Sequence, residues 1–430
     1  MNFITGLYID RESHTGSTAG RGLIYGFLPP VNTNTVVPGA ANILPTALGY
    51  YPSHRGVNET YSGFLQASWS ITHTLTLDAG ARYTQVDGSS TQSNLYIAPF
   101  YLSLFAGAAT GVPCNSVGVP ASTACLFVPP GEPINIKYSE NNVSPEVTLT
   151  WKPSEDITIY GSYKTGYKPG GVSQPSVLLE SNLAGDLNYG PEKADGGEVG
   201  FKGAFLDRRL SIISSLYYYQ FTGLQLNEFD SATTSFFIRN AGSAVTRGGE
   251  IQGTYQANSE LSFNGTVDYN DAYYSSYANA ACYAGQTLAE GCDIATASGT
   301  NLQNLTGKAL SNAPRWVVIT GVSWNHPMRK GLNLGVDADV KYSSKYAFTL
   351  DGSPIGVQGG FAKLNARLRL FGDNDRWEAA LIGRNLTNEF VALAGTTQPG
   401  TGNAEDHFAP EYTALVDRGR EVIIQFTVRR

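Results

Sequence analysis

The cysteines are the residues of this chain whose spacing points most directly to chemistry. There are four, and they form two close pairs, Cys114 with Cys125 and Cys282 with Cys292. An even number of cysteines at local spacing predicts two disulfides that close small loops, and disulfides require an oxidising compartment. A zinc site would need both pairs to converge, and no Cys-x-x-Cys spacing supports one. We therefore predict two disulfides and no metal centre.

Histidines, arginines and aromatic residues are the other candidates for binding a ligand. His14, His54 and His407 lie in segments expected to be loops, where an imidazole can ligate iron or haem but is more often simply solvated. Two segments rich in aromatic residues, 96–105 and 273–283, could stack on a bulky ligand. Four arginines are expected on polar strand faces, namely Arg82, Arg367, Arg369 and Arg384. They could attract an anionic chelate, but in a barrel filled by a plug such arginines more often pair with carboxylates of the plug. We assign no specific substrate-binding residue from the sequence.

The sequence does not indicate a catalytic centre. Carboxylates are scattered along strand faces and turns, rather than paired in the apolar setting that shifts their pKa values. The glycines follow strands and lead into loops, so they do not form a phosphate-binding loop that opens a helix. No Ser/His/Asp arrangement stands out. We predict that the chain is not an enzyme, with no catalytic residue and no cofactor.

The elements that carry these residues are strands with a hydrophobic period of two. In residues 75–83, 332–342 and 363–370, apolar residues alternate with polar or charged ones, so one face of each strand is apolar. Such runs last about 9 to 13 residues, which is the length that spans a bilayer at barrel tilt. Strands in soluble proteins average about five or six residues. The pattern therefore favours a membrane barrel.

Short and long connections alternate between the strands. The tight polar corners lie at residues 70–73, 152–156, 206–209, 258–260, 326–330 and 372–376. Two long insertions, residues 86–142 and 271–312, are predicted to be outer loops. We expect about fourteen strands, one in residues 2–10 and the others between residues 61 and 429. The sequence thus predicts an all-β fold, a transmembrane antiparallel β-barrel with short periplasmic turns and long outer loops.

Composition agrees with this prediction and excludes one class of partner. The 430 residues include 48 glycines and 25 tyrosines, and only 15% are charged. A net charge of −7 argues against nucleic acid. Mean hydropathy is −0.17, as expected when lipid-facing residues alternate with polar ones. Aromatic residues near strand ends predict an interfacial girdle, for example Trp69, Tyr83, Trp151, Tyr163 and Trp316. A soluble sandwich is the alternative, and strand length and turn asymmetry disfavour it.

Four segments carry a family resemblance. They are YGSYKTGYKPGG at 160–171, PEKADGGEVGFKG at 191–203, FIRNAGSAVTRGGEI at 237–251 and GRNLTNE at 383–389. In this order and spacing the chain resembles the barrel half of TonB-dependent outer-membrane receptors. The segments themselves are expected to be architectural. Gly170 and Gly171 would end a strand, Gly248 and Gly249 would allow a bulge or close strand approach, and residues 385–388 would turn the chain through side-chain hydrogen bonds.

The resemblance implies active uptake of a scarce, bulky nutrient, most often a ferric siderophore. Relatives also take up cobalamin, haem, nickel and carbohydrates. The family's barrels have 22 strands around an N-terminal plug, and a TonB box before the plug engages the energy-transducing complex. The expected partners are outer-membrane lipid, the TonB complex, a ferric siderophore or similar ligand, and the barrel assembly machinery. The expected location is the cell outer membrane of a Gram-negative bacterium.

The sequence also departs from the family pattern. No secretory signal, TonB box or plug is recognisable, about eight strands of a 22-strand barrel are missing, and the chain ends in Arg429 and Arg430 rather than an aromatic residue. We therefore expect residues 1–430 to be a partial barrel domain, the C-terminal part of a longer receptor, inactive by itself. A passive porin-like channel of about 14 to 16 strands remains the alternative.

Overall fold

The structure is a computed structural model of the 430-residue chain. It describes residues 1–17, 20–22, 48–97, 134–175, 187–230, 235–283, 285–295, 301–329, 331–372, 376–397 and 411–429. These residues are almost entirely β-strand, with one short 3₁₀-helix, η3 (Leu288–Glu290). Among the described residues, no helix has the length and hydropathy needed to cross a bilayer.

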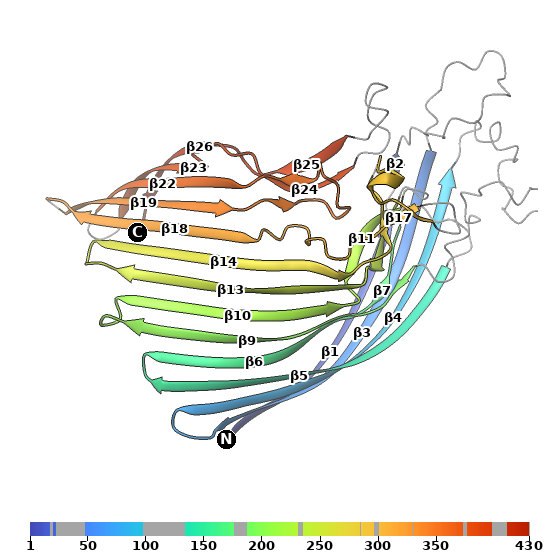
Figure 1. Ribbon diagram of the computed structural model, residues 1–430, viewed down its shortest axis with the longest axis horizontal. Helices are drawn as coiled ribbons and strands as arrows, with labels where there is room; N and C mark the ends of the chain where they lie inside the picture. The colour runs from blue at the N-terminus through green and yellow to red at the C-terminus, as the bar shows by residue number, and fades with distance from the viewer. Residues whose placement is uncertain are drawn as a thin grey trace, which may run out of the picture.

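One large antiparallel sheet dominates the molecule (Figure 1). Its fourteen main strands each pair with the next along the path, and β2 (Gly20–Gly22) joins β3 as an additional short partner. In order across the sheet the strands are β1 (Asn2–Ser17), β3 (Leu48–Ser70), β4 (Leu75–Ile97), β5 (Ile134–Ser154), β6 (Ile157–Lys168), β9 (Glu192–Phe205), β10 (Leu210–Thr222), β13 (Ser243–Gln256), β14 (Leu261–Ser276), β18 (Trp316–Pro327), β19 (Leu332–Ser343), β22 (Phe361–Gly372), β23 (Trp377–Arg384) and β26 (Glu421–Val428). The predicted number of strands is confirmed.

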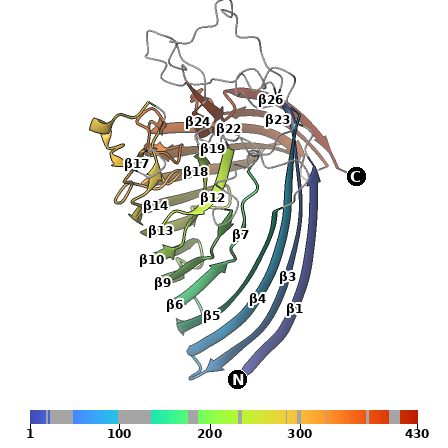
Figure 2. The same ribbon diagram turned by 90° about the vertical axis from the view of Figure 1, so that its right-hand side faces the viewer.

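The sheet curves strongly but does not close. Strands β1 and β26 form its two edges, and no pairing joins these two strands in the part of the chain that the structure describes. Figure 2 shows the resulting trough, with a concave and a convex face. The molecule is thus an open segment of an antiparallel barrel.

The two ends of the sheet differ, as the sequence predicted. At one end the strands turn within a few residues, for instance between β3 and β4 and between β9 and β10. Arg208 in the second of these turns lies on the same end as Asp156, and its Nε donates to the Asp156 carboxylate at 2.8 Å. This ion pair ties two neighbouring tight turns together, so the short-turn end is compact.

The other end carries five small sheets built from the long connections. Their strands are β7 (Gly171–Val172), β8 (Asn188–Tyr189), β11 (Gln225–Asp230), β12 (Ser235–Asn240), β15 (Ala280–Ala281), β16 (Ile294–Ala295), β17 (Asn301–Gln303), β20 (Tyr346–Ala347), β21 (Val357–Gln358), β24 (Ala392–Thr397) and β25 (Tyr412–Val416). We call this end, with its small sheets, the outer rim.

The bounds of both predicted outer loops are wrong. The predicted loop 271–312 begins inside β14, which continues to Ser276. Residues 86–142 were expected to be a single outer loop, but β4 continues to Ile97 and β5 already begins at Ile134. Strands β3 and β4 have 23 residues each and β5 has 21, well beyond the predicted span length. The pattern failed in β4 because residues 87–94 are polar on both faces. In β5 it failed because the apolar Ile134 and Ile136 lie on the face opposite Val143 and Val147, so the extension does not continue the outward apolar alternation.

The convex face shows where the membrane lies. Along β5 the outward residues Val143, Val147, Leu149 and Trp151 are apolar and 40–59% exposed. Beyond Val143 the outward positions become polar, and they are Asn135, Lys137, Ser139 and Asn141. Exposed apolar side chains in a continuous band are what hydrocarbon requires, and the polar extension projects into water.

Aromatic residues border this apolar band. Trp69, Trp151 and Trp316 are 54%, 47% and 44% exposed, and Tyr83 and Tyr163 are similarly exposed. Amphipathic rings favour the level of the lipid headgroups, so their place at the margins of the band fits an interfacial girdle. The predicted girdle is present on the outward face.

Replacing Val147 with arginine tests the band. Near the bilayer midplane a lipid-facing arginine costs about 2–4 kcal/mol, whereas near the interface it costs about 0–1 kcal/mol. We expect Val147→Arg to reduce the free energy of folding into phospholipid vesicles strongly, measured by denaturant titration. Ser139→Arg, on the same strand and face but above the band, is the matched control. Equal costs for the two variants would show that the band is misplaced.

Candidate functional site

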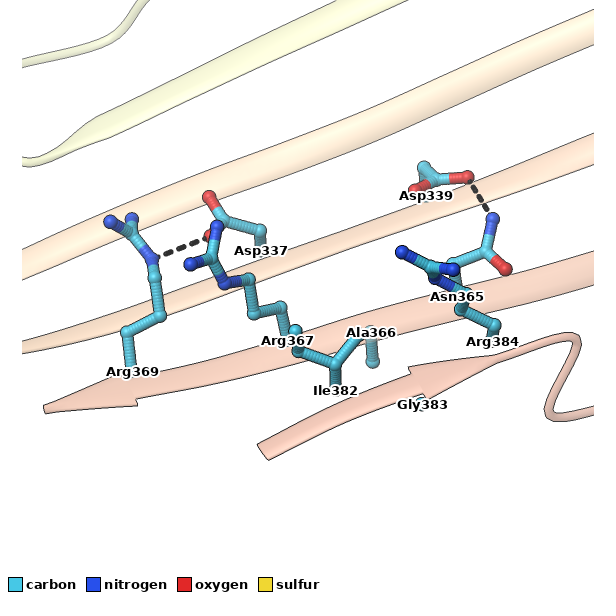
Figure 3. A pocket seen from close by; sticks show the side chains of 9 residues that line it. All are labelled: Asp337, Asp339, Asn365, Ala366, Arg367, Arg369, Ile382, Gly383 and Arg384. Atoms are coloured by element: carbon cyan, nitrogen blue, oxygen red, sulfur yellow. Dashed lines mark hydrogen bonds and ion pairs between the residues drawn. The ribbon is translucent and has the colours of Figure 1, made fainter. Parts of the chain in front are cut away.

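The concave face at the C-terminal side of the sheet forms a charged hollow of about 560 Å³. Strands β19, β22 and β23 direct alternate side chains into it, because successive residues of a strand point to opposite faces. Figure 3 shows these side chains. The hollow is lined by Asp337, Asp339, Asn365, Ala366, Arg367, Arg369, Ile382, Gly383 and Arg384. We call it the arginine hollow.

Strand register creates the ion pairs of the hollow. Asp337 lies directly opposite Arg367 in the β19–β22 pairing, with Arg369 on the diagonal. Arg369 Nε donates to Asp337 at 2.9 Å, and its Nη2 donates to Asn325 at 2.7 Å. The Arg369 side chain is only 18% exposed. Its orientation is therefore fixed by partners on two neighbouring strands.

Arg367 is less completely satisfied. Its Nη2 pairs with Glu378, while its Nε is buried and has no acceptor among the described residues. A buried donor without an acceptor is energetically costly. The Arg367 side chain as a whole is 37% exposed, so its guanidinium reaches the hollow through its other nitrogens. Arg384 is 60% exposed, and its Nη1 lies 3.9 Å from Glu421. The hollow thus presents one fixed and two more available guanidinium groups.

The four arginines predicted to face inward do not form one group. Arg367, Arg369 and Arg384 line the arginine hollow, but Arg82 lies on the distant N-terminal part of the sheet. There its Nη2 donates to Ser62 at 3.0 Å, and its guanidinium lies 5.5 Å from the centre of the Tyr8 ring. The alternation of apolar and polar residues in the sequence predicted the polar face for Arg82, but it did not predict the contacts with Ser62 and Tyr8.

A lysine pair extends the positive charge toward the outer rim. Lys341 and Lys363 are directly opposite in the β19–β22 register, where like charges repel. Asp417, in the connection before β26, forms an ion pair with Lys363. Hydrogen bonds from the Lys363 ammonium and from the Arg418 backbone N–H hold the pKa of Asp417 below its usual value. The carboxylate thus anchors the connection to the wall.

The β11–β12 hairpin packs against the inner side of the rim at two places. On one side Phe237 is fully buried with Leu187, and Ile134, Ile136 and Val172 pack around them. Two hydrogen bonds of Ser173 strengthen this contact. The Ser173 Oγ donates to the Ile238 carbonyl at 2.9 Å and accepts from the Ile238 N–H at 2.8 Å. The hairpin is thereby fixed to the β7–β8 segment.

On its other side the hairpin meets the end of β14 and the connection that follows it. Tyr274 and Tyr277 are buried there with Leu305, and Leu226 of the hairpin packs against them. The Tyr277 hydroxyl donates to the Glu228 carboxylate. Burial, with the nearby negative charge, raises the pKa of Tyr277, so the hydroxyl keeps its proton. The hairpin therefore bridges two parts of the outer rim.

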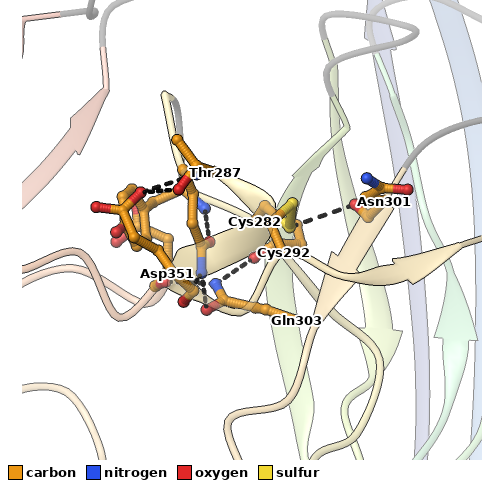
Figure 4. The surroundings of a disulfide bond; sticks show 10 residues. Cys282, Thr287, Cys292, Asn301, Gln303 and Asp351 are labelled. Atoms are coloured by element: carbon orange, nitrogen blue, oxygen red, sulfur yellow. Dashed lines mark hydrogen bonds between the residues drawn. A yellow bond between two sulfur atoms is a disulfide. The ribbon is translucent and has the colours of Figure 1, made fainter.

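One predicted disulfide is present in this rim. Cys282 and Cys292 are bonded, with their Cα atoms 5.7 Å apart (Figure 4). Between them Glu290 accepts hydrogen bonds from the Thr287 backbone N–H and hydroxyl, both at 2.8 Å, and these bonds lower the pKa of Glu290. The other predicted pair, Cys114 with Cys125, lies outside the described residues.

Polar contacts join this disulfide loop to the next connection. Gln303 Nε2 donates to the carbonyl oxygens of Ala281 and Asp351, each at 2.7 Å. The Asp351 carboxylate in turn accepts from the Tyr412 hydroxyl at 3.2 Å, and burial raises the pKa of Tyr412 to about 12. Loops far apart in the sequence thus form one connected surface.

One prediction about the aromatic segments needs correction, and the other lies almost wholly outside the described residues. Residues 273–283 were expected to offer rings to a ligand, but Tyr274 is 3% and Tyr277 is 6% exposed. These rings form a hydrophobic cluster, because the rim needs a core of its own. In the other segment, Tyr96 and Ile97 end β4 and the rest lies outside the described residues.

Two of the three predicted loop histidines are on strands. His14 lies on β1 and His54 on β3, with ring centroids 5.9 Å apart, and His407 lies outside the described residues. His14 Nε2 is 3.3 Å from Gln174 Nε2. Among the described residues, no group of three or more His, Cys, Asp or Glu side chains could hold a metal ion.

The glycine and asparagine motifs have the architectural roles expected of them. A Cβ on Gly248 would lie 2.0 Å from the Tyr269 carbonyl oxygen, so this position requires close strand approach. Asn385 has a φ of 47°, and its side chain binds both the N–H and the carbonyl of Glu389 at 2.9 Å. The turn that follows β23 is thus made by side-chain hydrogen bonds.

Chemically, the concave face can bind a polar or charged solute. It offers the guanidinium groups and carboxylates of the arginine hollow below the outer rim. Arginine forks suit carboxylates and other planar anions.

Comparison with known proteins gives one family. The model of the TonB dependent receptor-like, beta-barrel family matches residues 4–386. No curated protein sequence matches the chain.

Solved structures share the fold at low sequence identity. The ferric yersiniabactin uptake receptor FyuA from Yersinia pestis is 15% identical, with a TM-score of 0.60 over 88% of this chain and 47% of its own. The siderophore receptor PiuA from Acinetobacter baumannii is 16% identical, with a TM-score of 0.57 over 86% of this chain and 43% of its own. The closed form of the ferric-catecholate import receptor Fiu from E. coli K12 is 15% identical, with a TM-score of 0.58 over 99% and 51%. The chain spans about half the length of these structures.

Breaking the Cys282–Cys292 bond should loosen the rim locally. In the chain-entropy model, a disulfide that joins residues with a sequence separation of 10 stabilises the folded loop by roughly 2–3 kcal/mol. We expect reduction to speed hydrogen exchange in residues 285–295, while the large sheet is unchanged. Exchange read by mass spectrometry with and without reductant provides the measurement. A Cys282→Ser/Cys292→Ser variant is the control, since reductant should not affect this loop in it.

The ion pair of Asp417 predicts a pH dependence. Because the pKa of Asp417 is lowered by folding, its stabilisation is fully present above the ordinary value of 3.8 and is lost as pH falls through the lowered pKa. We expect Asp417→Asn to increase exchange in residues 411–420 at neutral pH. The difference from the unmodified chain should vanish in strong acid. A difference that grows toward acid would contradict the assigned pair.

Proposed function

Because this chain belongs to the TonB-dependent receptor-like β-barrel family, we propose that it forms the wall of a receptor that imports a bulky iron complex. Barrels of this family lie in the outer membrane of Gram-negative bacteria, and the apolar band on the convex face of this chain suits that location. A ferric siderophore is the substrate class that we favour. Transport, rather than catalysis, is the activity that we assign.

The observation that carries this proposal is the open, fourteen-stranded antiparallel sheet with a charged concave wall. In hydrocarbon, an unpaired strand edge leaves backbone groups unsatisfied at several kcal/mol each. The edges of β1 and β26 would be satisfied by further strands, which supports a larger barrel as the working unit. A passive channel of 14 to 16 strands would require these two edges to meet, so the observed sheet disfavours it.

We propose that a plug domain fills the concave side in the complete receptor. The guanidinium groups of Arg367 and Arg384, whose side chains are 37% and 60% exposed, would then bind plug carboxylates or the anionic groups of a passing chelate. Energy would come from the TonB complex through a region N-terminal to the barrel. The outer rim, with its preassembled hairpins, would make the first contact with the ligand.

The substrate class is supported by the names of the similar structures. FyuA takes up ferric yersiniabactin, PiuA is a siderophore receptor and Fiu imports a ferric catecholate. The copper transporter OprC shares the fold as well, with a TM-score of 0.52. Iron complexes are therefore the first ligands to test, and copper is the comparison.

Uptake in iron-starved cells tests the function. The test uses a gene that joins the in-frame DNA upstream of the Met1 codon to the coding sequence of this chain. Its expression should restore uptake of a radiolabelled ferric siderophore in a receptor-deficient strain with intact TonB. The chain alone behind a signal peptide should not restore it, because β1 and β26 are each paired on one side only among the described residues. Uptake that persists without TonB would indicate a passive channel instead.

The arginine hollow provides a variant pair for the same assay. We expect Arg367→Gln/Arg384→Gln to lower uptake by about tenfold, since charged hydrogen bonds to plug or ligand are lost. Arg208→Gln, an exposed arginine of the short-turn end, is the matched control and should retain uptake. If both variants behave alike, the hollow has no role in transport.

A further inference from the structure

A compact pair of arginines lies on the convex face, away from the arginine hollow. Arg247 of β13 and Arg315, which immediately precedes β18, both bind the carboxylate of Asp271 on β14. The Arg247 Nη2–Asp271 Oδ2 distance is 2.9 Å, and the Arg315 Nη2–Asp271 Oδ1 distance is 3.1 Å. We call the two arginines, together with the aspartate that joins them, the outer arginine pair.

Strand register places this pair at the margin of the apolar band. Arg247 is opposite Tyr218 on one side and Asp271 on the other. Two residues before Asp271, on the same outward face, Tyr269 is opposite Trp316, with ring centroids 4.8 Å apart. Tyr218 and Trp316 are both 44% exposed. The pair thus lies just outside an aromatic girdle, at the level where lipid headgroups are found.

The exposure of the three side chains shows which groups are available. The Arg247 and Arg315 side chains are 54% and 63% exposed, whereas Asp271 is 17% exposed. The carboxylate therefore lies beneath two guanidinium groups that reach the surface. Each guanidinium has five N–H donors, and the bonds to Asp271 use only some of them.

The charges do not cancel. Two guanidinium groups and one carboxylate leave a net charge of +1 on a face that otherwise meets hydrocarbon and headgroups. The carboxylate holds the two forks side by side, so little side-chain entropy would be lost on binding an anion between them. Guanidinium forks match the oxygen geometry of phosphate.

We infer that the outer arginine pair binds the phosphate group of an outer-leaflet lipid. The positive charge of the two arginines favours an anion, and the geometry of their guanidinium groups favours phosphate. The aromatic girdle lies next to the pair, so a lipid bound there would place its acyl chains against the apolar band. The site goes beyond the proposed uptake, because it lies on the face opposite the concave wall and needs no transported ligand. Its role would be to anchor one lipid at the outer margin of β13, β14 and β18.

Lipid retention by the full chain in detergent tests this site. The probe is lipid A with two phosphates, and enzymatically dephosphorylated lipid A, with the same acyl chains, is its partner. Native mass spectrometry should show the phosphorylated form bound, and Arg247→Gln/Arg315→Gln should reduce its retention by about tenfold or more. Arg208→Gln, which removes an exposed, Asp-paired arginine at the opposite end of the sheet, should retain it fully.

Two further arms separate the possible explanations. Arg247→Lys/Arg315→Lys keeps the charge without the fork and should restore part of the retention, which a merely misfolded variant would not do. Inorganic phosphate at equal concentration should not displace the lipid. Equal binding of dephosphorylated lipid A, equal loss in Arg208→Gln, or full displacement by inorganic phosphate would each overturn the inference.

Discussion

Backbone hydrogen bonding in hydrocarbon is the constraint on which the rest of this structure depends. No water is available there to satisfy a peptide group, so each strand must be paired along its whole length inside the membrane. The antiparallel ladder from β1 to β26 meets this requirement for twelve inner strands, whereas the two edge strands are paired on one side in the described residues. That imbalance is the physical basis of our proposal that this sheet belongs to a larger barrel and not to a closed passive channel.

Once the ladder is in place, the period of two divides all side chains between two environments. The convex face carries an apolar band that ends in aromatic rings, and the concave face carries ion pairs such as Arg369 with Asp337. Charge on the concave side is tolerable because water or protein fills it. Charge on the convex side is found at the margin of the band, where Arg247 and Arg315 share Asp271. The two arginine groups therefore serve different surroundings.

The outer rim is stabilised differently from the large sheet, since it lies in water and needs a hydrophobic core of its own. Phe237 with Leu187, and Tyr277 with Leu305, form two small clusters that fix the β11–β12 hairpin. The bond between Cys282 and Cys292 and the contacts of Gln303 add covalent and polar links. A surface assembled in this way is held in place by its own contacts, and such preorganisation lowers the entropic cost of any binding that it supports.

The sequence alone determined the strand type, the two faces, the tight corners and the Cys282–Cys292 pair, because each depends on residues near one another in the chain. It did not reveal the extensions of β4 and β5, since the first is polar on both faces and the second turns its apolar residues, Ile134 and Ile136, toward the rim cluster rather than toward lipid. Nor did it reveal the burial of Tyr274 and Tyr277. Register decided that Asp337 lies opposite Arg367 and that Arg247 meets Asp271. Such pairings depend on how neighbouring strands align, which only the tertiary structure fixes.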